Sequence, residues 1–207
     1  MVGAASHSAQ PHHRPLFGGA ISTAIPPQFA DVSKIRQVPD NQEIFAHAPT
    51  DRSLIVELLQ LHPDIPQPPH TTPASHHFSV IATDAHALRA DLAASKLLPT
   101  SQLPALLTVD PRLHLSFAHG THVVSKFRDH TAAANTVNVY VVCIRLPNVA
   151  TDVLLVFNDP IQLHPHSSST NLGSSVADPH QTDPTIRSSV LQQALNTFQI
   201  NDWSLFR

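Results

Sequence analysis

The sequence predicts one α+β domain: a twisted, mainly antiparallel sheet with helices on both faces. Residues 136–146 and 152–158 predict two strands, and their nearly continuous apolar runs predict a sheet that is covered on both faces. About five residues join them, which is too few for a parallel crossover and predicts an antiparallel pair. Residues 51–62 and 185–198 carry apolar residues at helical spacing and are expected to supply covering helices.

The first quarter of the chain predicts a tail, a strand and several turns. Residues 1–15 are expected to be a disordered tail, so that the single domain spans residues 16–207. Residues 16–21 (LFGGAI) predict a first strand with a tight backbone feature at its two adjacent glycines. Short elements follow: a turn or helix cap at 31–33, a turn at 38–43 and a strand at 44–46.

The next part predicts two helices separated by a loop and a strand. Thr50 or Asp51 can cap a helix over residues 51–62. Its apolar stripe consists of Leu54, Ile55, Leu58, Leu59 and Leu61. Residues 63–77 are rich in proline and predict a mobile loop. A strand is expected at 78–83, and the Ala- and Leu-rich residues 85–98 predict a second helix.

The second half predicts strands and a closing helix. Residues 113–117 alternate between apolar and polar side chains, and residues 119–122 predict a turn into a strand at 123–127. Residues 160–184 are polar and are expected to be mobile. The closing helix at 185–198 has an apolar stripe of Ile186, Val190, Leu191, Leu195 and Phe198, and the tail residues Trp203, Leu205 and Phe206 are expected to pack back onto the body.

Composition excludes several classes of protein. The 12 Lys and Arg residues against 15 Asp and Glu give a net charge of −3, which argues against a protein built to bind a phosphate backbone. A single cysteine, Cys143, excludes an intrachain disulfide framework. No apolar run reaches the 18 or so residues of a membrane span. Because residues 1–10 also lack the pattern of a secretory signal, we expect a soluble protein of a reducing compartment.

The 16 histidines predict no metal site, although three pairs could each supply two ligands: His76 with His77, His119 with His122, and His164 with His166. A zinc site needs three or four ligands at defined spacing, and neither an HExxH motif nor a neighbouring cysteine completes any pair. The histidines lie mostly in stretches of Pro, Ser, Thr and Ala, which is typical of a compositional bias.

Motifs of catalysis and of nucleotide binding are absent as well. The sequence has no GxSxG, no GxxxxGK[ST] and no GxGxxG. Cys143 lies inside the most apolar predicted strand and is expected to be a buried small hydrophobe rather than a nucleophile. We therefore predict no catalytic residue and no cofactor.

Acidic residues gather early in the chain, at Asp31, Asp40, Glu43, Asp51 and Glu57. If the helix at 51–62 packs its apolar stripe inward, Glu57 and Gln60 point outward together, because residues three apart share a helix face. On composition alone, a solvated helix face with scattered charges is the favoured interpretation. In a chain with only 13% charged residues, the cluster is still a candidate docking surface for a basic partner.

Several segments together resemble one family, the Ran guanine nucleotide release factors. Their order and approximate spacing agree with the family across the chain. They are LFGGAI at 16–21, DVS at 31–33, RQVPDNQE at 36–43, DRSLIVELL at 51–59, IRL at 144–146, TDVLL at 151–155 and WSLF at 203–206. The VPDNQE segment between DVS and SLIVELL is the most specific part, and residues 63–131 match weakly.

The resemblance implies an α/β/α sandwich around a six-stranded or similar antiparallel sheet, a fold shared with extrinsic photosystem subunits. It further implies that the chain binds the small GTPase Ran, promotes release of guanine nucleotide and supports nuclear protein import, without covalent catalysis. We accordingly expect a monomer of the nucleus and cytoplasm that binds neither nucleic acid nor membrane.

The resemblance also implies a partner-binding surface. In the family, an acidic patch includes the position that matches Glu57. The position three further on is commonly acidic and is Gln60 here, which removes one charge. Asp31, Asp40 and Glu43 match motif positions too, although turn chemistry explains them equally well. Arg36 is a candidate to pair with one of these carboxylates, which would make it structural.

Two alternatives stay open on the sequence alone. One is a binding module on the same fold with a different partner, because fold does not fix function. The other is a hydrolase or metal enzyme that uses the histidines. Metal content after purification without a His tag separates this second alternative from the others.

Overall fold

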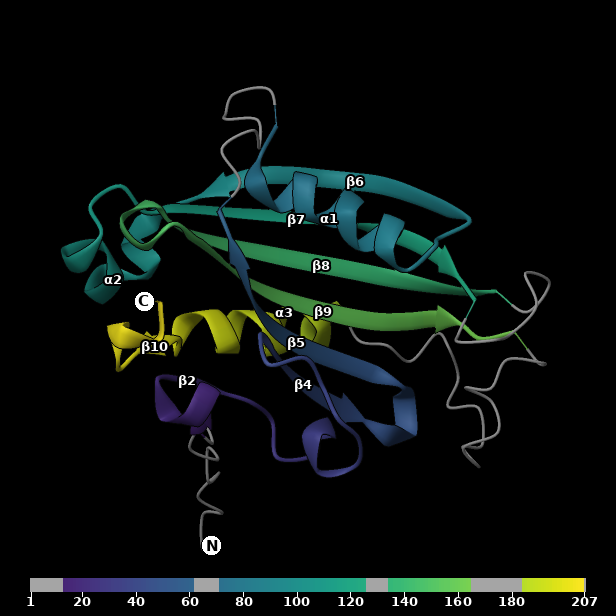
Figure 1. Ribbon diagram of the computed structural model, residues 1–207. Coiled ribbons are helices and arrows are strands. Elements are labelled where there is room, and N and C mark those ends of the chain that lie inside the picture. The colour runs from purple at the N-terminus through teal and green to yellow at the C-terminus, as the bar shows by residue number, and fades with distance from the viewer. Residues whose placement is uncertain (1–12, 62–70, 126–133, 165–183, 207) are drawn as a thin grey trace, which may run out of the picture.

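A seven-stranded antiparallel sheet organises the chain (Figure 1). The computed structural model describes residues 13–61, 71–125, 134–164 and 184–206. In spatial order the strands are β3 (Ala30–Asp31), β4 (Gln42–His47), β5 (Arg52–Gln60), β9 (Thr151–Gln162), β8 (Asn135–Leu146), β7 (His114–Val124) and β6 (Arg89–Leu98). A smaller sheet has the order β1 (His13–Leu16), β2 (Ile21–Ala24) and β10 (Gln199–Ile200). This confirms the predicted α+β class, with one strand more than the resemblance implied.

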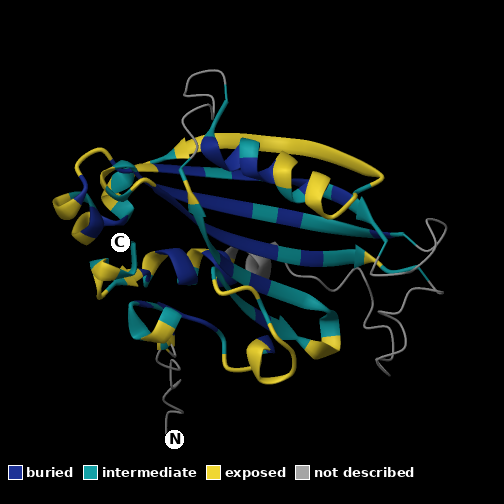
Figure 2. Ribbon diagram, viewed as in Figure 1, coloured by how far each residue is buried: buried dark blue, intermediate teal, exposed yellow. Residues whose placement is uncertain are grey.

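The centre of the large sheet is the predicted antiparallel pair, β8 and β9. A 3₁₀ turn at Pro147–Val149 joins the strands, and Ala150 closes it in the left-handed region at φ 47°. Alternate residues point to opposite faces, so that Val141 and Cys143 lie in one apolar cluster while Val142 and Ile144 lie in the other. The prediction that both faces are covered is confirmed (Figure 2).

Helices lie on both faces of the large sheet, as predicted (Figure 1). On one face α1 (Pro73–Asp84) packs against β6, β7 and β8, and Phe78 inserts into the smaller cluster. On the other face α3 (Pro184–Asn196) packs against β9 and β2, and contributes Leu191 and Leu195 to the larger cluster. The short α2 (Pro104–Val109) follows β6 and adds Leu106 to that cluster.

The predicted helix at 51–62 is wrong, because residues 52–60 form strand β5. Asp51 adopts a left-handed conformation at φ 53° and turns the chain from β4 into β5, which pair from His47 with Arg52 to Gln42 with Glu57. A strand with apolar residues on both faces carries an almost continuous apolar run, and such a run also satisfies helical spacing. The SLIVELL segment is therefore ambiguous when read by period alone.

The predicted strand at 78–83 is wrong as well, since these residues belong to α1. Thr72 and Ser75 form a capping box, and Pro73 occupies the first helical turn. The predicted loop at 63–77 thus ends before Pro73, and its residues 63–70 lie outside the described part of the chain. The cap, rather than the β-branched Val80 and Ile81, decides the conformation.

The predicted helix at 85–98 is strand β6, and the predicted turn at 119–122 is the middle of β7. Ala and Leu favour helices, but pairing along the whole length of β7 overrides that preference. Gly120 permits a close approach rather than a turn. A Cβ at this position would meet the carbonyl oxygen of Asp91, and would lie 2.7 Å from the ring of Phe78.

The ends of the chain are ordered further out than predicted. Strand β1 begins at His13, inside the expected tail, while residues 1–12 lie outside the described part. The LFGGAI segment is two strands joined by the 3₁₀ turn Phe17–Gly19, in which all three residues have positive φ. The closing helix is confirmed as α3, and Trp203, Leu205 and Phe206 pack against the larger cluster as expected. Residues 165–183, most of the predicted mobile segment, lie outside the described part, whereas β9 continues to Gln162.

Among the described residues, no helix combines the length and the hydropathy needed to cross a membrane. The likeness to extrinsic photosystem subunits stays a prediction.

Candidate functional site

Glu57 lies on the α1 side of the sheet, near the end of β5. It is half-buried between Ile55 and Leu59, which point to the same face. Across the strand pair, the Gln42 side-chain amide donates a hydrogen bond of 2.7 Å to Glu57 Oε1. A neighbouring strand thus fixes the position of this carboxylate.

Gln60 does not share a face with Glu57, which corrects the prediction that the two point outward together. In a strand, side chains alternate, so residues three apart lie on opposite faces. Gln60 is exposed at the last position of β5. The two residues therefore share one end of the strand but not one face.

Asp40 lies at that same end. It precedes Asn41, whose carbonyl accepts a hydrogen bond of 2.9 Å from the amide of Leu58, and whose side chain donates one of 3.1 Å to the Leu58 carbonyl. Asp40 is exposed. The structure thus brings Asp40, Glu57 and Gln60 together around the end of the β4–β5 pair, and this group is called the β5-end site below.

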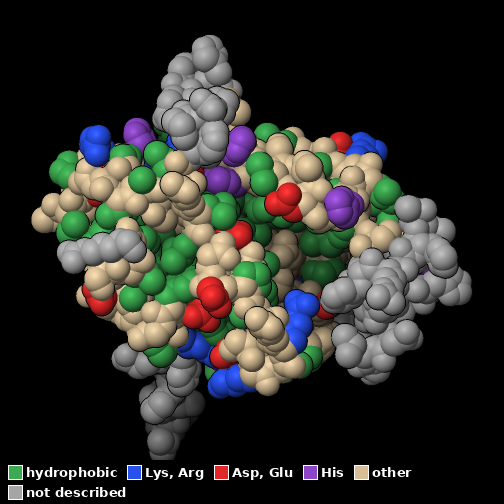
Figure 3. Space-filling model, in the orientation of Figure 1, with side chains coloured by type: hydrophobic (Ala, Val, Ile, Leu, Met, Phe, Trp, Pro, Cys, Tyr) green, Lys and Arg blue, Asp and Glu red, His purple; other side chains and the backbone are tan. Residues whose placement is uncertain are grey.

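The sheet beside Glu57 is open on the α1 side. Among the described residues, α1 is the helix that packs on this face, and it packs on β6, β7 and β8 rather than on β4 and β5. Ile44 and Ile55 are paired across these strands and both are half-buried. Figure 3 shows this face of the molecule, where acidic and apolar side chains lie side by side near the centre. Such a mixed surface suits a protein partner.

Glu43, Asp31 and Arg36 lie apart from the β5-end site. Glu43 points to the other face of the sheet, where Oε1 accepts a hydrogen bond of 2.6 Å from the Phe17 amide. Asp31 caps a 3₁₀ turn, with Oδ1 accepting from the amide and hydroxyl of Ser33 at 2.9 and 2.6 Å. Arg36 is exposed, and the ion pair considered for it is not among those that the described residues form. Glu43 and Asp31 thus accept hydrogen bonds from backbone amides. These contacts support a structural role for the two residues, which the sequence left open.

The sequence analysis missed a buried ionic cluster beneath α1. Arg145 donates two hydrogen bonds of 2.8 Å to the two oxygens of Asp152, and His77 Nε2 lies 2.8 Å from Asp152 Oδ2. All three side chains are almost fully buried. Burial alone would raise the pKa of Asp152, but hydrogen bonds from Arg145 and His77 outweigh it and hold that pKa below its usual range.

A signal for this cluster was present in the sequence. Arg145 and Asp152 are charged residues inside the IRL and TDVLL segments, both otherwise apolar. They face each other in the register of β8 and β9, so a tight hairpin between the strands makes them partners. The segments that carry the family resemblance here encode a core ion pair that anchors α1 through His77.

Cys143 lies beside this cluster: its Sγ, a ring nitrogen of His77 and an oxygen of Asp152 all lie within 4.8 Å of one another. The trio is a poor metal site, because Arg145 engages both carboxylate oxygens and places a cation where a metal would be bound. Burial raises the pKa of the Cys143 thiol well above its usual value, which disfavours the thiolate that metals and electrophiles need. The prediction that Cys143 is a buried hydrophobe is confirmed.

The histidine pairs do not assemble ligand sets among the described residues. His119 and His122 lie on opposite faces of β7, since they are three apart in a strand. His122 packs on Phe78 with ring centroids 4.4 Å apart, and its burial lowers its pKa. His77 belongs to the ionic cluster beneath α1, and His166 lies outside the described part of the chain.

Comparison with known families matches residues 14–160 to the family described as "Ran-interacting Mog1 protein". This range covers most of the chain, from β1 into β9, and includes the β5-end site and the ionic cluster. The chain belongs to the Ran-interacting Mog1 family. The resemblance stated from the sequence is therefore confirmed.

Curated relatives agree with this membership. The chain is 39% identical over 159 residues to the Ran guanine nucleotide release factor of Danio rerio, covering 75% of this chain and 82% of the relative. It is 31% identical over 195 residues to the probable Ran guanine nucleotide release factor of Dictyostelium discoideum, covering 93% and 95%. The nuclear import protein Mog1 of Schizosaccharomyces pombe is 31% identical over 185 residues, covering 89% and 90%.

Solved Mog1 structures share the fold. The Ran-binding protein Mog1p of Saccharomyces cerevisiae superposes with a TM-score of 0.65 at 23% identity, covering 96% of this chain and 99% of that one. A structure described as a mutant of protein Mog1 gives a TM-score of 0.63 at 22% identity, covering 96% and 100%. Both support the α+β architecture around the antiparallel sheet.

Proposed function

We propose that this chain binds the small GTPase Ran, promotes release of its guanine nucleotide and so supports nuclear protein import. Membership of the Ran-interacting Mog1 family carries the proposal, together with relatives named as Ran guanine nucleotide release factors over most of their length. The chain acts in the nucleus and cytoplasm, because two relatives are named as nuclear import proteins.

The β5-end site is the proposed contact with Ran. Glu57 supplies a carboxylate on an open sheet face, and Asp40 adds a second, exposed one at the same end of the strand pair. Apolar side chains of Ile44 and Ile55 beside them provide surface to bury. Charge complementarity with basic groups of the partner would steer and orient the complex.

Nucleotide release follows from differential affinity. A GTPase holds its nucleotide through a P-loop Lys, backbone amides and Mg²⁺. A protein that binds the nucleotide-free state more tightly than the loaded state shifts the equilibrium toward release. In this proposal the Glu57 carboxylate pairs with basic groups that phosphate and Mg²⁺ leave behind. No bond of the nucleotide is broken, so the chain acts as a monomeric release factor without catalytic residues or cofactor, and it needs neither nucleic acid nor membrane.

The alternative is a binding module of the same fold with a different partner. Gln60 is the observation that favours this alternative, because the resemblance implies an acidic residue at this position and the chain has an uncharged one. The two proposals differ in one result: only a Ran-specific factor accelerates release from Ran.

The test is the release of fluorescent guanine nucleotide from purified Ran as this chain is added at increasing concentration. We expect acceleration by the natural chain and a loss of at least about tenfold for Glu57→Arg, because a like charge then faces the basic groups of Ran. Asp84→Arg is the matched control: it makes the same charge reversal at the exposed end of α1, away from the β5-end site, and should retain acceleration.

Each outcome has a distinct meaning. Equal acceleration by Glu57→Arg and the natural chain would contradict the proposed surface and keep the function. No acceleration by the natural chain would contradict the function itself.

A further inference from the structure

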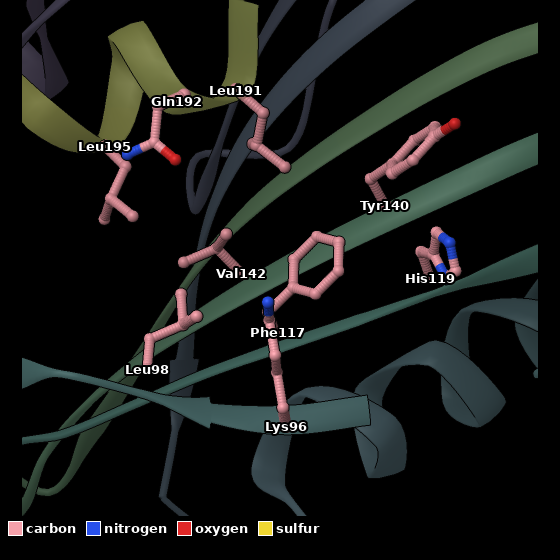
Figure 4. A pocket seen from close by; sticks show the side chains of 9 residues that line it. All are labelled: Lys96, Leu98, Phe117, His119, Tyr140, Val142, Leu191, Gln192 and Leu195. Atoms are coloured by element: carbon pink, nitrogen blue, oxygen red, sulfur yellow. The ribbon is translucent and has the colours of Figure 1, made fainter. Parts of the chain in front are cut away.

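A concave site lies on the α3 face of the sheet, between β6–β8 and α3 (Figure 4). It is a partly enclosed cavity of about 350 Å³. Cavities that hold small organic ligands start at about 300 Å³. The strand residues that line it, such as Phe117, alternate with those that face α1, so this cavity is separated from Glu57 by the thickness of the sheet.

The walls of the cavity are mostly apolar. Phe117 and Val142 belong to the sheet wall, and Leu191 and Leu195 of α3 face them across the space (Figure 4). A flat, apolar ligand body fits between an aromatic ring and these branched side chains, since it removes apolar surface from water on both sides.

The polar groups of the lining are few. Among the described residues that line the cavity, Lys96 is the one with a formal charge, and none of them is Asp or Glu. Its ammonium group lies 5.9 Å from the centroid of the Phe117 ring, so the cation stands over the sheet wall of the cavity. Gln192 of α3 adds a side-chain amide from the opposite wall. A lone cation without a carboxylate partner in the lining selects an anion.

His119 contributes the body of its ring to the cavity wall. Its Nδ1 is buried and has no hydrogen-bond partner among the residues that the structure describes. Because this atom is not accessible from the cavity, the ring rather than the nitrogen is the surface that a ligand meets. The ring lies between those of Phe117 and Tyr140, at centroid distances of 5.7 and 5.6 Å, which makes the sheet wall a continuous aromatic surface.

We propose that the cavity between α3 and strands β6–β8 binds a small aromatic carboxylate. The aromatic body lies against Phe117 and faces Leu195, and the carboxylate reaches Lys96. The site goes beyond the proposed binding of Ran, because none of its lining residues belongs to the β5-end site.

The experiment titrates the full chain with 2-naphthoate and follows the methyl resonances of Leu191 and Leu195 by NMR. The neutral isostere 2-naphthamide is the matched ligand. We expect saturable shifts with 2-naphthoate and about fivefold weaker binding of the amide, as an interaction with a partly exposed cation allows. Lys96→Met should abolish this preference, while Lys34→Met, which removes a distant exposed lysine, should keep it.

Gln192→Trp tests the location. Gln192 is exposed on α3, so this variant retains the core while its indole fills the mouth of the cavity, and binding should weaken at least about tenfold. The proposal is overturned by an absence of saturable shifts at millimolar 2-naphthoate, by equal affinities of the two ligands for the natural chain, or by unchanged binding to Gln192→Trp.

Discussion

At the scale of single residues, the charged side chains of this chain divide into two groups with different tasks. Glu57 and Asp40 lie at the surface end of a strand pair, where a partner can reach them. Asp152 and Arg145 lie in the core, where two hydrogen bonds join them. Glu43 and Asp31 are intermediate, because each accepts hydrogen bonds from backbone amides that secondary structure leaves unpaired.

The buried cluster gives the first stability prediction. Asp152→Asn removes the charge that balances Arg145, and an uncompensated buried charge typically costs about 3–5 kcal/mol. We expect the free energy of unfolding, measured by urea denaturation, to fall by that amount. The control Asp84→Asn changes an exposed carboxylate and should stay within about 0.5 kcal/mol of the natural chain. A loss below about 1 kcal/mol for Asp152→Asn would contradict the anchoring role of the cluster.

His122 predicts a pH dependence of stability. Because burial lowers its pKa in the folded state, the unfolded chain takes up the proton first as pH falls through about 6.5. Stability should therefore decrease from about pH 7.5 to about pH 5, and the decrease should be smaller in His122→Gln, which cannot titrate. Urea denaturation at both pH values measures the difference. An identical decrease in the two proteins would show that His122 makes no contribution.

The uncharged side chain of Gln60 gives a third prediction at the residue scale. Gln60 is exposed beside the proposed contact, so Gln60→Glu introduces the acid that the family resemblance implies at this position without disturbing packing. We expect affinity for Ran to rise by about two- to fivefold, as one added rim charge typically gives. Titration calorimetry at low and at high salt measures it, and the gain should shrink with salt. Weaker binding by Gln60→Glu would indicate that the partner surface near this position is not basic.

At the scale of elements, the central strands and the closing helix were predicted correctly from the sequence, whereas β5 and β6 were predicted as helices. The β8–β9 pair and α3 were predicted correctly, because a short link dictates antiparallel pairing and α3 has one clear apolar stripe. β5 was mistaken for a helix because its apolar residues fill both faces, which leaves no alternation to detect. β6 was mistaken for a helix for a different reason. Its Ala- and Leu-rich composition favours a helix, and pairing with β7 makes it a strand.

The mistaken helix at 51–62 also explains why Glu57 and Gln60 were wrongly predicted to share a face. Glu57 was selected from the residues and the resemblance, and the structure places it on an open face. Its relation to Gln60 could not be predicted, because it depends on whether residues three apart share a face. The buried Arg145–Asp152 pair could have been found from the register of the predicted hairpin, whereas His77 becomes its neighbour only once α1 is docked.

Gly120 tests the element-scale account of β7. A methyl group there would meet the backbone of β6 and the ring of Phe78, so Gly120→Ala must separate β6 or α1 from the sheet. We expect a loss of about 2–3 kcal/mol in the free energy of unfolding, typical of overpacking. Thr121→Ala, at the next residue and on the other face, should lose less than about 1 kcal/mol. Equal losses would contradict the close approach at Gly120.

At the scale of the whole molecule, the sheet separates two surfaces with different chemistry. The α1 face exposes an acidic and apolar strip on β4 and β5, which suits a protein partner. The α3 face holds an apolar cavity with one cation, which suits a small anion. The two halves of the fold can therefore be altered independently: variants of the β5-end site should leave 2-naphthoate binding unchanged, and Gln192→Trp should leave Ran binding unchanged.

The most direct test of the central claim compares the affinity of this chain for nucleotide-free Ran with its affinity for Ran loaded with guanine nucleotide and Mg²⁺. Linkage requires that a factor which weakens nucleotide binding at equilibrium binds the empty state more tightly, by the same ratio. We predict a preference of at least about tenfold for nucleotide-free Ran, together with dissociation of that complex by excess nucleotide. Equal affinities for the two states would contradict release by differential binding.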